Sequence, residues 1–249
     1  MTKIALVTGA TSGIGHATAL ELARQGYHII ATGRRTERLE ELKKQITNVP
    51  VYTLAFDVRD NEAVQQAINS LPAAWRQVEV LVNNAGNAHG LSTIQNGSLD
   101  DWDAMIDINV KGLLYVSKAV LPLMLAHKKG HIINIGSIAG KEVYPNGNVY
   151  CASKHAVDAL SQAMRLDLVK EGIKVSEVNP GMVETEFSEV RFKGDKDRAA
   201  SVYEGFQPLQ AQDIAELIGF IVSRPAHVNW AEVLILPAAQ ASATVVNKQ

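Results

Sequence analysis

Short, β-branched apolar segments alternate with longer amphipathic segments along the whole chain. Several of the apolar segments are almost continuously hydrophobic, as in strands that are buried on both faces of a parallel sheet. The predicted strands are Lys3–Thr8, Tyr27–Thr32, Val51–Phe56, Val80–Asn83, His131–Ile135, Lys174–Val178 and Val233–Leu236. The predicted helices are Gly13–Gln25, Thr36–Ile46, Asn61–Ser70, Asp101–His127, Val149–Glu171 and Ala211–Ser223. This alternation predicts an α/β fold: a doubly wound (Rossmann), mainly parallel seven-stranded sheet with helices on both faces.

The alternation continues through all 249 residues without an internal repeat or a linker, so we expect a single domain, residues 1–249. Only residues 184–208 break the rhythm, as an irregular insertion of polar, charged and aromatic residues before the last helix. Long insertions in compact domains are usually functional loops. We therefore expect substrate choice to come from this insertion.

The formal net charge of −2 argues against a nucleic-acid binder that relies on bulk electrostatics. The apolar run at the N-terminus is too short for a signal peptide. The most apolar long stretch, residues 112–126, is too short to span a bilayer. We therefore expect a cytoplasmic protein that acts on a small molecule, with no nucleic-acid or membrane partner.

Cys151 is the only cysteine, which excludes an intramolecular disulfide and a cysteine-clustered zinc site. Because it lies next to Tyr150, we expect it to be a small packing residue. His127 and His131 flank a predicted helix end and strand start, where charge and capping account for them. No metal site is expected.

A glycine-rich turn, Thr8-Gly9-Ala10-Thr11-Ser12-Gly13-Ile14-Gly15, follows the first strand and opens the first helix. Glycine lets the backbone approach a pyrophosphate, and the helix N-terminus offers free N–H groups and a positive dipole. A tight turn without a ligand is the alternative, but the position between first strand and first helix favours a dinucleotide site. Its expected cofactor residues are Gly9, Thr11, Ser12, Gly13, Ile14 and Gly15.

The second strand lacks the acidic residue that usually binds the ribose 2′-hydroxyl about 20 positions after such a turn. It ends instead in Ala31-Thr32-Gly33-Arg34-Arg35. An acid there would repel a 2′-phosphate, whereas Arg34 can donate charge-assisted hydrogen bonds to it. The sequence therefore predicts NADP(H) as the cofactor, bound at Arg34 and Arg35, unless both arginines are solvated charges on the next helix.

Three more strand ends carry residues suited to a dinucleotide. Asp57, after the third strand, lies where an adenine amino group would be met, or else caps the helix that begins near Asp60. After the fourth strand, small residues and an amide allow close approach to the adenosine side, although a plain polar turn has the same composition: Asn84, Ala85 and Gly86. After the sixth strand, backbone groups and a hydroxyl are placed to fix the nicotinamide carboxamide, unless this is a simple Pro-Gly turn: Pro180, Gly181, Val183 and Thr185.

Tyr150 and Lys154 are four positions apart on a strong helical pattern. Four residues turn a helix through about 400°, so both side chains project from one face. Ser137 follows the fifth strand, and Asn109 lies within the preceding long predicted helix. Because strand ends of a doubly wound sheet converge on one crevice, Ser137 and the Tyr150 helix are expected to meet there.

Reducing a ketone with a nicotinamide hydride leaves an oxyanion that must be protonated, and oxidising an alcohol requires the reverse. Free tyrosine has a pKa of about 10, and a neighbouring Lys154 ammonium favours the tyrosinate. Ser137 would orient the substrate oxygen. Asn109 is a poor helix former, so it either faces solvent or serves a polar site.

Together these residues, in this order and spacing, resemble the short-chain dehydrogenase/reductase family over essentially the whole chain. The resemblance implies that Tyr150 is the general acid/base and that Lys154 modulates its pKa and binds the nicotinamide ribose. It implies that Ser137 polarises the carbonyl and that Asn109 anchors a water in a proton relay.

Within the family, the chain is similar to the NADP-dependent 3-hydroxy acid (serine) dehydrogenases, a tetrameric group that acts on serine, 3-hydroxypropionate and related acids. The most diagnostic stretch is Thr185-Glu186-Phe187-Ser188-x-Val190-Arg191-Phe192-Lys193-Gly194-Asp195. The tail after Pro237 reads differently from that group. The similarity implies a homotetramer and a carboxylate-bearing substrate, for which Arg191 and Lys193 are the candidate cations, unless both are surface charges.

The first function we expect is therefore NADP(H)-dependent interconversion of short 3-hydroxy acids and their 3-oxo forms. The alternative is a reductase of the same family for other carbonyls, such as a 3-oxoacyl thioester. A non-enzymatic NADP-binding sensor would often lack the tyrosine or the lysine, and a sugar epimerase would need a larger substrate region. Both are disfavoured.

Overall fold

The computed structural model describes residues 3–249, and its seven-stranded sheet is parallel throughout. The strands lie in the order β3-β2-β1-β4-β5-β6-β9. Their bounds are β1 Ile4–Val7, β2 His28–Gly33, β3 Val51–Ala55, β4 Val78–Asn83, β5 Gly130–Ile135, β6 Ile173–Pro180 and β9 Glu232–Ile235. Each predicted strand is present, with ends that differ from the prediction by at most two residues.

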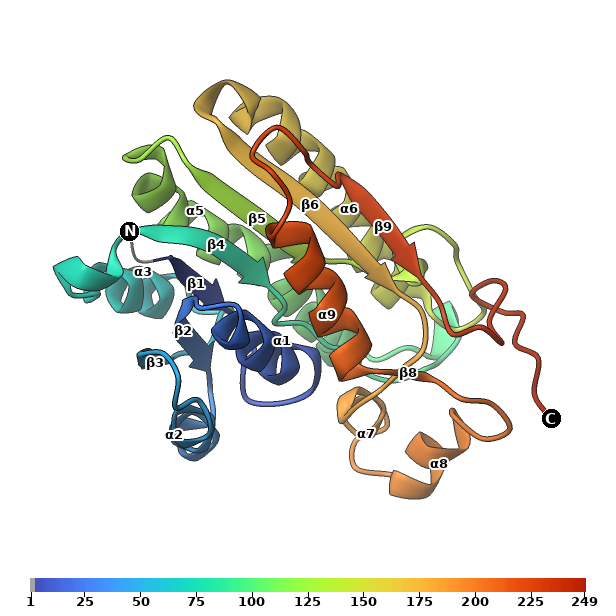
Figure 1. The fold of residues 1–249 in the computed structure, drawn as a ribbon. Coiled ribbons are helices and arrows are strands. Elements are labelled where there is room, and N and C mark those ends of the chain that lie inside the picture. The colour runs from blue at the N-terminus through green and yellow to red at the C-terminus, as the bar shows by residue number, and fades with distance from the viewer. Residues whose placement is uncertain (1–2) are drawn as a thin grey trace.

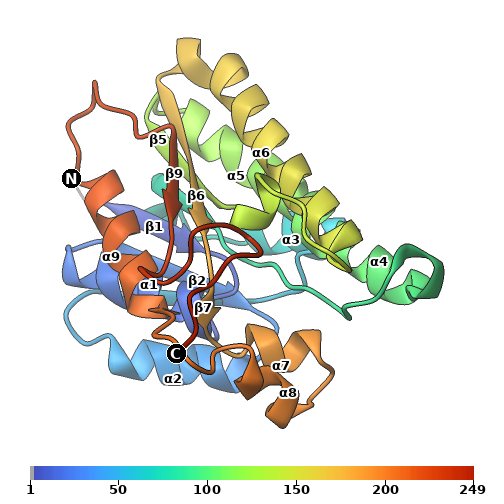
Figure 2. The ribbon, with the colours of Figure 1, turned by 90° about the vertical axis from the view of Figure 1, so that its right-hand side faces the viewer.

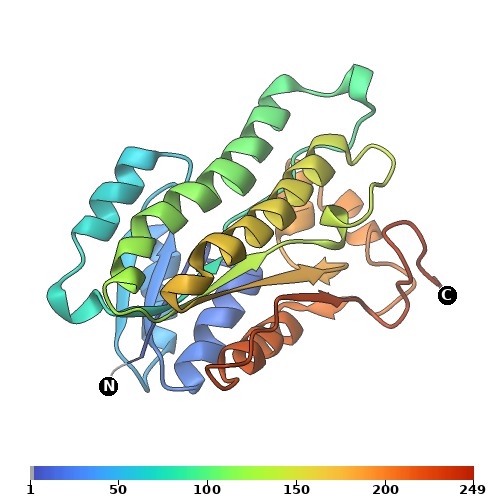
Figure 3. The same ribbon diagram turned by 90° about the horizontal axis from the view of Figure 1, so that it is seen from above.

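Helices cover both faces of this sheet, so that the fold has three layers (Figure 3). Side chains of a strand alternate between faces, and β1 shows this directly, since Ile4 and Leu6 belong to one core while Ala5 and Val7 belong to the other. The first core contains α3 (Asn61–Asn69), α5 (Leu113–Leu125) and α6 (Asn148–Leu168). The second contains α1 (Gly13–Arg24), α2 (Thr36–Gln45) and α9 (Ala211–Val222). The predicted doubly wound fold is confirmed.

The sheet order reverses beside β1, whose neighbours are β2 on one side and β4 on the other. In doubly wound sheets, ligands bind outside the carboxyl ends of the strands at such a reversal. The strands point toward the same end of the molecule, where the insertion and the C-terminal tail lie (Figure 1).

The insertion contains two short helices, α7 (Phe187–Arg191) and α8 (Lys196–Ser201), which lie side by side (Figure 2). A two-residue parallel ladder between β7 (Val183–Glu184) and β8 (Leu209–Gln210) closes its base. The expectation of an irregular segment is therefore wrong. The helices are too short for a hydrophobic period, and α8 begins with a local cap, in which Asp195 accepts a 3.0 Å hydrogen bond from the Arg198 amide.

The predicted helix Asp101–His127 consists of α4 (Leu99–Ile106), one π-helical turn (Asp107–Gly112) and α5. The continuous run, residues 99–125, has the length and composition of a membrane span, but 56% of its most apolar window is buried inside the protein. It is a core helix. Short 3₁₀ turns occupy Ala73–Trp75, Ile94–Asn96, Ile138–Gly140 and Val169–Glu171, the last of which replaces the predicted end of α6.

His131 is a buried core residue rather than a strand-start charge. Its Nε2 lies 2.7 Å from the Ser176 hydroxyl on the neighbouring strand β6. Burial, assisted by the charge of Lys174, lowers the pKa of His131 to about 3, so the ring is neutral. The capping interpretation is therefore wrong for His131, whereas Cys151 is a buried packing residue as predicted.

Candidate functional site

A cleft of about 630 Å³ opens at the carboxyl ends of the strands. Most of the residues singled out from the sequence line it: Gly9, Thr11, Ser12, Gly13, Ile14, Arg34, Arg35, Asp57, Asn84, Ala85, Gly86, Ser137, Tyr150, Lys154, Pro180, Gly181, Val183, Thr185 and Arg191. Gly15, Asn109 and Lys193 stand behind it or outside it. These residues come from eight separate stretches of the chain, and the predicted topology brings the strand ends among them to one side of the sheet.

The glycine-rich turn leaves β1 with left-handed backbone at Gly9 (φ 65°) and Gly13 (φ 52°), which favours glycine at both positions. Asn84, at the end of β4, braces this turn. Its Nδ2 donates a 2.8 Å hydrogen bond to the Thr8 carbonyl, and its amide donates to the Thr8 hydroxyl at 2.9 Å. Asn84 therefore shapes the turn as well as lining the cleft.

Two glycines of the turn show how tightly it is built. A Cβ on Gly15 would lie 2.4 Å from the Gly9 carbonyl oxygen, so Gly15 allows the helix to pack on the turn rather than forming a wall of the cleft. A Cβ on Gly13 would lie 3.3 Å from the Thr185 side chain. The turn after β1 and the segment after β6 thus face each other across a narrow gap.

The two arginines after β2 have different surroundings. Arg34 is 60% exposed in its side chain and lies 3.7 Å from Asp57. Arg35 donates from Nε and Nη2 to the Thr11 hydroxyl (3.2 and 2.9 Å) and from Nη2 to the Ser12 hydroxyl (2.8 Å). Arg34 is therefore the more open guanidinium, and Arg35 braces the glycine-rich turn.

Asp57 forms a close pair with Arg59, whose Nη2 lies 2.7 Å from Oδ2. Burial alone would raise the pKa of the Asp57 carboxyl, but hydrogen bonds from Arg59 outweigh this effect and hold the pKa below its ordinary value. The cap of α3 is Asp60, which accepts from the amides of Glu62 and Ala63. The capping alternative for Asp57 is therefore wrong, and its carboxylate lines the cleft.

Tyr150 and Lys154 project from one face of α6, and Ser137 closes β5 beside them. The Lys154 Nζ donates a 2.9 Å hydrogen bond to the Ile135 carbonyl and lies 6.0 Å from the centre of the Tyr150 ring. The Ser137 amide donates to Asn179 Oδ1 at 3.0 Å, which ties β5 to β6 at the site. All three side chains are buried, with 9% or less exposed.

Burial has the largest effect on the pKa values of Tyr150 and Lys154. It raises the pKa of Tyr150 above the ordinary value, whereas a hydrogen bond with Ser137 and the charge of Arg191 act in the opposite direction. Burial lowers the pKa of Lys154 to about 8, and the nearby Glu177 carboxylate opposes this shift. In this cleft, the tyrosine hydroxyl is protonated at neutral pH and is suited to donate a proton.

Asn109 lies in the π-helical turn and is 2% exposed. Its Oδ1 accepts from the Asn87 amide at 2.9 Å, and its Nδ2 donates to the Asn87 carbonyl (2.8 Å) and the Ser153 hydroxyl (3.0 Å). A Cβ on Gly86 would lie 3.0 Å from Asn109 Oδ1 and 3.6 Å from Lys154 Nζ. Asn109 therefore serves a buried polar site directly behind Lys154.

Arg191, the last residue of α7, reaches from the insertion into the cleft. Its Nη2 donates to the Tyr144 hydroxyl at 2.9 Å and its Nε to the Gly90 carbonyl at 3.2 Å. The guanidinium carbon lies 5.6 Å from the centre of the Tyr150 ring. These hydrogen bonds from Nε and Nη2 hold the guanidinium in place, and none from Nη1 is found within residues 3–249.

Lys193, in contrast to Arg191, does not line the cleft. It follows the end of α7 with φ 55°, its side chain is 63% exposed, and its Nζ lies 3.0 Å from Asp101 Oδ1. Of the two cations predicted from the sequence, only Arg191 lines the cleft.

Several cleft residues were not predicted from the sequence. Tyr144 has an aromatic position six residues before Tyr150 but no motif to mark it. Gln240 in the C-terminal tail accepts from the Met182 amide at 2.9 Å, and Lys248 and Ala243 also line the cleft. No spacing rule connects a C-terminal tail to a turn about 60 residues earlier, because only the fold brings them together.

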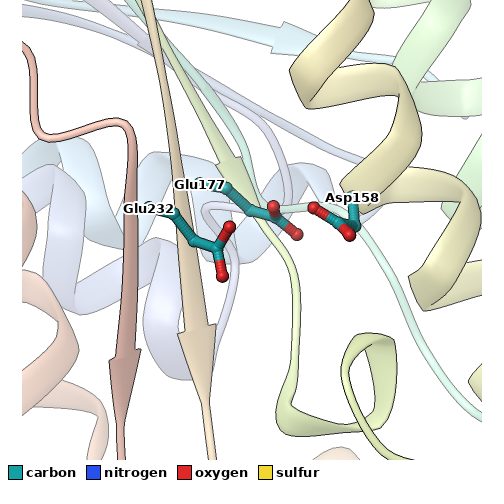
Figure 4. Close-up of side chains that lie close together, drawn as sticks. All are labelled: Asp158, Glu177 and Glu232. Carbon is teal, nitrogen blue, oxygen red and sulfur yellow. The ribbon is translucent and has the colours of Figure 1, made fainter.

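Three carboxylates, Asp158, Glu177 and Glu232, point toward one another behind the site (Figure 4). The Lys141 Nζ lies 2.8 Å from Asp158, 2.9 Å from Glu232 and 3.7 Å from Glu177. The ammonium supplies the positive charge that a metal ion would otherwise bring. Burial raises the pKa of the fully buried Glu177 to about 7.

The chain is similar to known proteins over nearly its whole length. The short chain dehydrogenase family model matches residues 3–196. The NADP-dependent 3-hydroxy acid dehydrogenase YdfG of Salmonella typhi is 46% identical over 241 residues, which cover 96% of this chain and 97% of that protein. Sulfoacetaldehyde reductase 2 of Chromohalobacter salexigens is also 46% identical, over 97% of this chain and 96% of the relative.

Solved structures give the same result. The closed form of serine dehydrogenase complexed with NADP⁺ superposes with a TM-score of 0.93, at 44% identity, and covers 99% of this chain and 100% of that one. The resemblance inferred from the motifs is confirmed: the chain is an enzyme of the short-chain dehydrogenase family.

Proposed function

We propose that this protein is an NADP(H)-dependent oxidoreductase that interconverts short 3-hydroxy acids, of the serine and 3-hydroxypropionate type, with their 3-oxo forms. The observation that carries the proposal is the position of the Arg191 guanidinium, 5.6 Å from the centre of the Tyr150 ring. A cation so close to the expected proton donor suits a substrate whose anionic end lies a short distance from its reacting oxygen.

The cleft fits a dinucleotide. The glycine-rich turn and the Thr185 segment form a narrow cradle that a single Cβ at Gly13 would fill. We assign the 2′-phosphate to Arg34, the adenine end to Asp57, and the nicotinamide end to the turn after β6. NADP is the cofactor of the Salmonella relative and is bound in the solved serine dehydrogenase. When bound, it supplies or accepts the hydride.

The chain's own residues handle the proton. In the direction of reduction, Tyr150 donates its hydroxyl proton to the substrate oxygen while Ser137 donates a hydrogen bond to the same oxygen. In the direction of oxidation, the positive charge of Lys154 stabilises the tyrosinate that accepts the alcohol proton. Asn109 holds the polar surroundings of Lys154 in place.

Arg191 would bind the carboxylate with a charge-assisted hydrogen bond from Nη1. The same geometry suits a sulfonate, and one relative is a sulfoacetaldehyde reductase. 3-Hydroxypropionate and 2-hydroxyethanesulfonate both place a primary alcohol two carbons from an anionic group. An aldehyde bearing a sulfonate is therefore the second candidate substrate.

One experiment tests the proposal: NADP⁺ reduction measured with 3-hydroxypropionate, serine, 2-hydroxyethanesulfonate and the neutral alcohol 1-propanol. We expect kcat/KM for the best acid to exceed that for 1-propanol by about tenfold or more, since an ionic hydrogen bond contributes about 1.5–3 kcal/mol. The Tyr150→Phe variant is the control and should lose about 100-fold or more in kcat. Equal rates on acids and 1-propanol, or faster turnover of an acetoacetyl thioester with NADPH, would overturn it.

We also propose that the chain acts as one NADP(H)-binding unit within a cytoplasmic homotetramer. Large apolar side chains at the end of α6 support association, because Leu166 is 79% exposed and Val169 is 68% exposed. Light scattering after gel filtration should give four times the 27.0 kDa mass of one chain. A mass of one chain would contradict the assembly.

A further inference from the structure

Glu177 is a buried carboxyl group behind the Tyr150 end of the cleft, and the mechanism described so far does not use it. It lies on β6, between β5 and β9, and is 0% exposed. Neither of its carboxyl oxygens has a hydrogen-bond partner within residues 3–249. Because burying such a group costs free energy, its position beside a cleft points to a role in function rather than in stability.

The Glu177 side chain contacts the end of β5, where the residues of the site are held. A Cβ on Gly136 would lie 2.5 Å from Glu177 Oε1, so only a glycine leaves room for the carboxyl group there. The residue before Gly136 is Ile135, whose carbonyl accepts a 2.9 Å hydrogen bond from Lys154 Nζ. The residue after it is Ser137. Glu177 therefore lies against the segment that carries Ser137 and anchors Lys154.

Besides Lys154, charged groups from three elements face the Glu177 carboxyl group. Lys141 comes from the 3₁₀ turn after β5, Asp158 from α6 and Glu232 from β9 (Figure 4). On the β5 side, the residue in register with Glu177 is an uncharged asparagine. The Lys141 Nζ lies 2.8 Å from Asp158 and 2.9 Å from Glu232, but 3.7 Å from Glu177. Glu177 is therefore the carboxyl group of the three that this ammonium compensates least.

The charge of Glu177 changes close to neutral pH. Burial raises the pKa of Glu177 to about 7, although the Lys141 ammonium opposes this shift. Burial lowers the pKa of Lys154 to about 8, and the Glu177 carboxylate opposes that shift. As the pH rises, Glu177 therefore becomes negative just before Lys154 loses its proton, and the new negative charge favours the ammonium form of Lys154.

We propose that Glu177 is a positioning residue, whose negative charge keeps Lys154 protonated in neutral and alkaline solution and so sustains alcohol oxidation there. The inference rests on the proposed function, in which the Lys154 charge stabilises the tyrosinate form of Tyr150 that accepts the alcohol proton. In acid solution Glu177 is itself protonated, and Lys154 is charged without its help. The carboxylate is therefore needed only where Lys154 would otherwise become neutral.

The first test measures the protonation of Lys154 by competitive labelling with acetic anhydride over a range of pH, followed by mass spectrometry of the Lys154 peptide. In Glu177→Gln, the pKa of Lys154 should fall by about 0.5 to 1 unit, because a neighbouring negative charge is gone. Glu177→Asp keeps the charge and should stay close to the unaltered protein. Glu79→Gln is the matched control, since Glu79 also lies on a strand and pairs with a lysine, Lys129, at 2.9 Å. It should leave Lys154 unchanged.

The second test measures kcat/KM for the alcohol that the unaltered protein oxidises fastest, at about pH 6 and about pH 9, on either side of the ordinary range of these two groups. In Glu177→Gln, kcat/KM at the higher pH should fall about three- to tenfold, which corresponds to the expected change in the pKa of Lys154. At the lower pH it should stay within about twofold, because Glu177 is protonated in the unaltered protein. A purely structural role would lower kcat/KM equally at both pH values, and that result would overturn the inference.

Because the labelling of Lys154 needs no substrate, the two tests distinguish failure of this inference from failure of the proposed function. If the pKa of Lys154 is the same in Glu177→Gln and in an unaltered protein that oxidises 3-hydroxy acids as expected, only the role of Glu177 is overturned. If the pKa of Lys154 falls but kcat/KM at the higher pH does not, the charge of Lys154 does not serve oxidation. The role of Glu177 and the proton-transfer part of the proposed function are then both overturned.

Discussion

The Arg191 guanidinium lies 5.6 Å from the centre of the Tyr150 ring, while Arg191 itself belongs to the insertion and Tyr150 to α6. A hydrogen bond to Tyr144 and one to the Gly90 carbonyl fix the guanidinium there. Tyr150, the proposed proton donor, and the Arg191 cation are therefore supplied to the cleft by separate parts of the chain.

Arg191→Ala should lower kcat/KM for 3-hydroxypropionate by about 100-fold, because a charge-assisted hydrogen bond contributes about 1.5–3 kcal/mol. Activity on 1-propanol should change by no more than about threefold. Steady-state kinetics with both alcohols checks this. Lys193→Ala is the matched control, since Lys193 pairs with Asp101 outside the cleft. Equal losses on both alcohols would remove the carboxylate role from Arg191.

Lys154→Met should raise the pH at which alcohol oxidation becomes fast. A base is needed for oxidation, the positive charge of Lys154 favours the tyrosinate, and its removal leaves Tyr150 protonated to higher pH. We expect the apparent pKa in kcat/KM to rise by about one unit or more. The measurement is a kcat/KM profile from acid to alkaline pH, with Lys154→Arg as the variant that keeps the charge. An unshifted profile in Lys154→Met would show that the charge does not act on Tyr150.

Arg34→Ala should raise the KM for NADPH by about 30-fold, which corresponds to about 2 kcal/mol for a charge-assisted hydrogen bond. The KM for NADH should change by less than about twofold, since NADH has no phosphate at that position. Initial rates measured over a range of NADPH and of NADH concentrations give the two KM values and test this prediction. A similar rise for both cofactors would mean that Arg34 supports the cleft in general and does not select the phosphate.

Glu177→Gln should change how stability depends on pH. Burial raises the pKa of Glu177 from 4.5 to about 7, so the folded protein keeps this proton over a range in which the unfolded chain loses it. Stability therefore falls as pH rises from about 4.5 to 7, by about 3 kcal/mol from this group at most. Urea unfolding should show Glu177→Gln gaining relative to the unaltered protein over that range. A constant difference between the two would show that Glu177 does not titrate there.

Much of the fold could be predicted because buried parallel strands are recognisable by composition alone. The three-layer order follows once strand and helix alternate. The π-helical turn at Asn109 was not predictable, because the partners of the Asn109 side chain, the Asn87 backbone after β4 and the Ser153 hydroxyl on α6, come together only in the folded chain. The insertion helices were missed for a different reason: at five or six residues they carry no period.

The residues of the site, like the elements of the fold, could be predicted from the sequence only in part. Tyr150, Lys154 and the glycine-rich turn were predictable, since their chemistry fixes their spacing. Arg191 and Lys193 could not be separated by sequence, because they are two positions apart in a segment without a helical period, and only the end of α7 between them sends their side chains in different directions. His131 was misread because it is buried by the position of β5 between β4 and β6, and its partner Ser176 lies on β6, 45 positions away along the chain.

The two-residue ladder between β7 and β8 holds the two ends of the insertion side by side. Val183 pairs with Leu209 and Glu184 with Gln210, so both ends of the segment leave the body about 4.8 Å apart. Each doubling of a loop's length adds only about 0.6 kcal/mol of closure entropy. Segments of other lengths can therefore connect these two strands at little cost in free energy, while the sheet and the glycine-rich turn stay as they are.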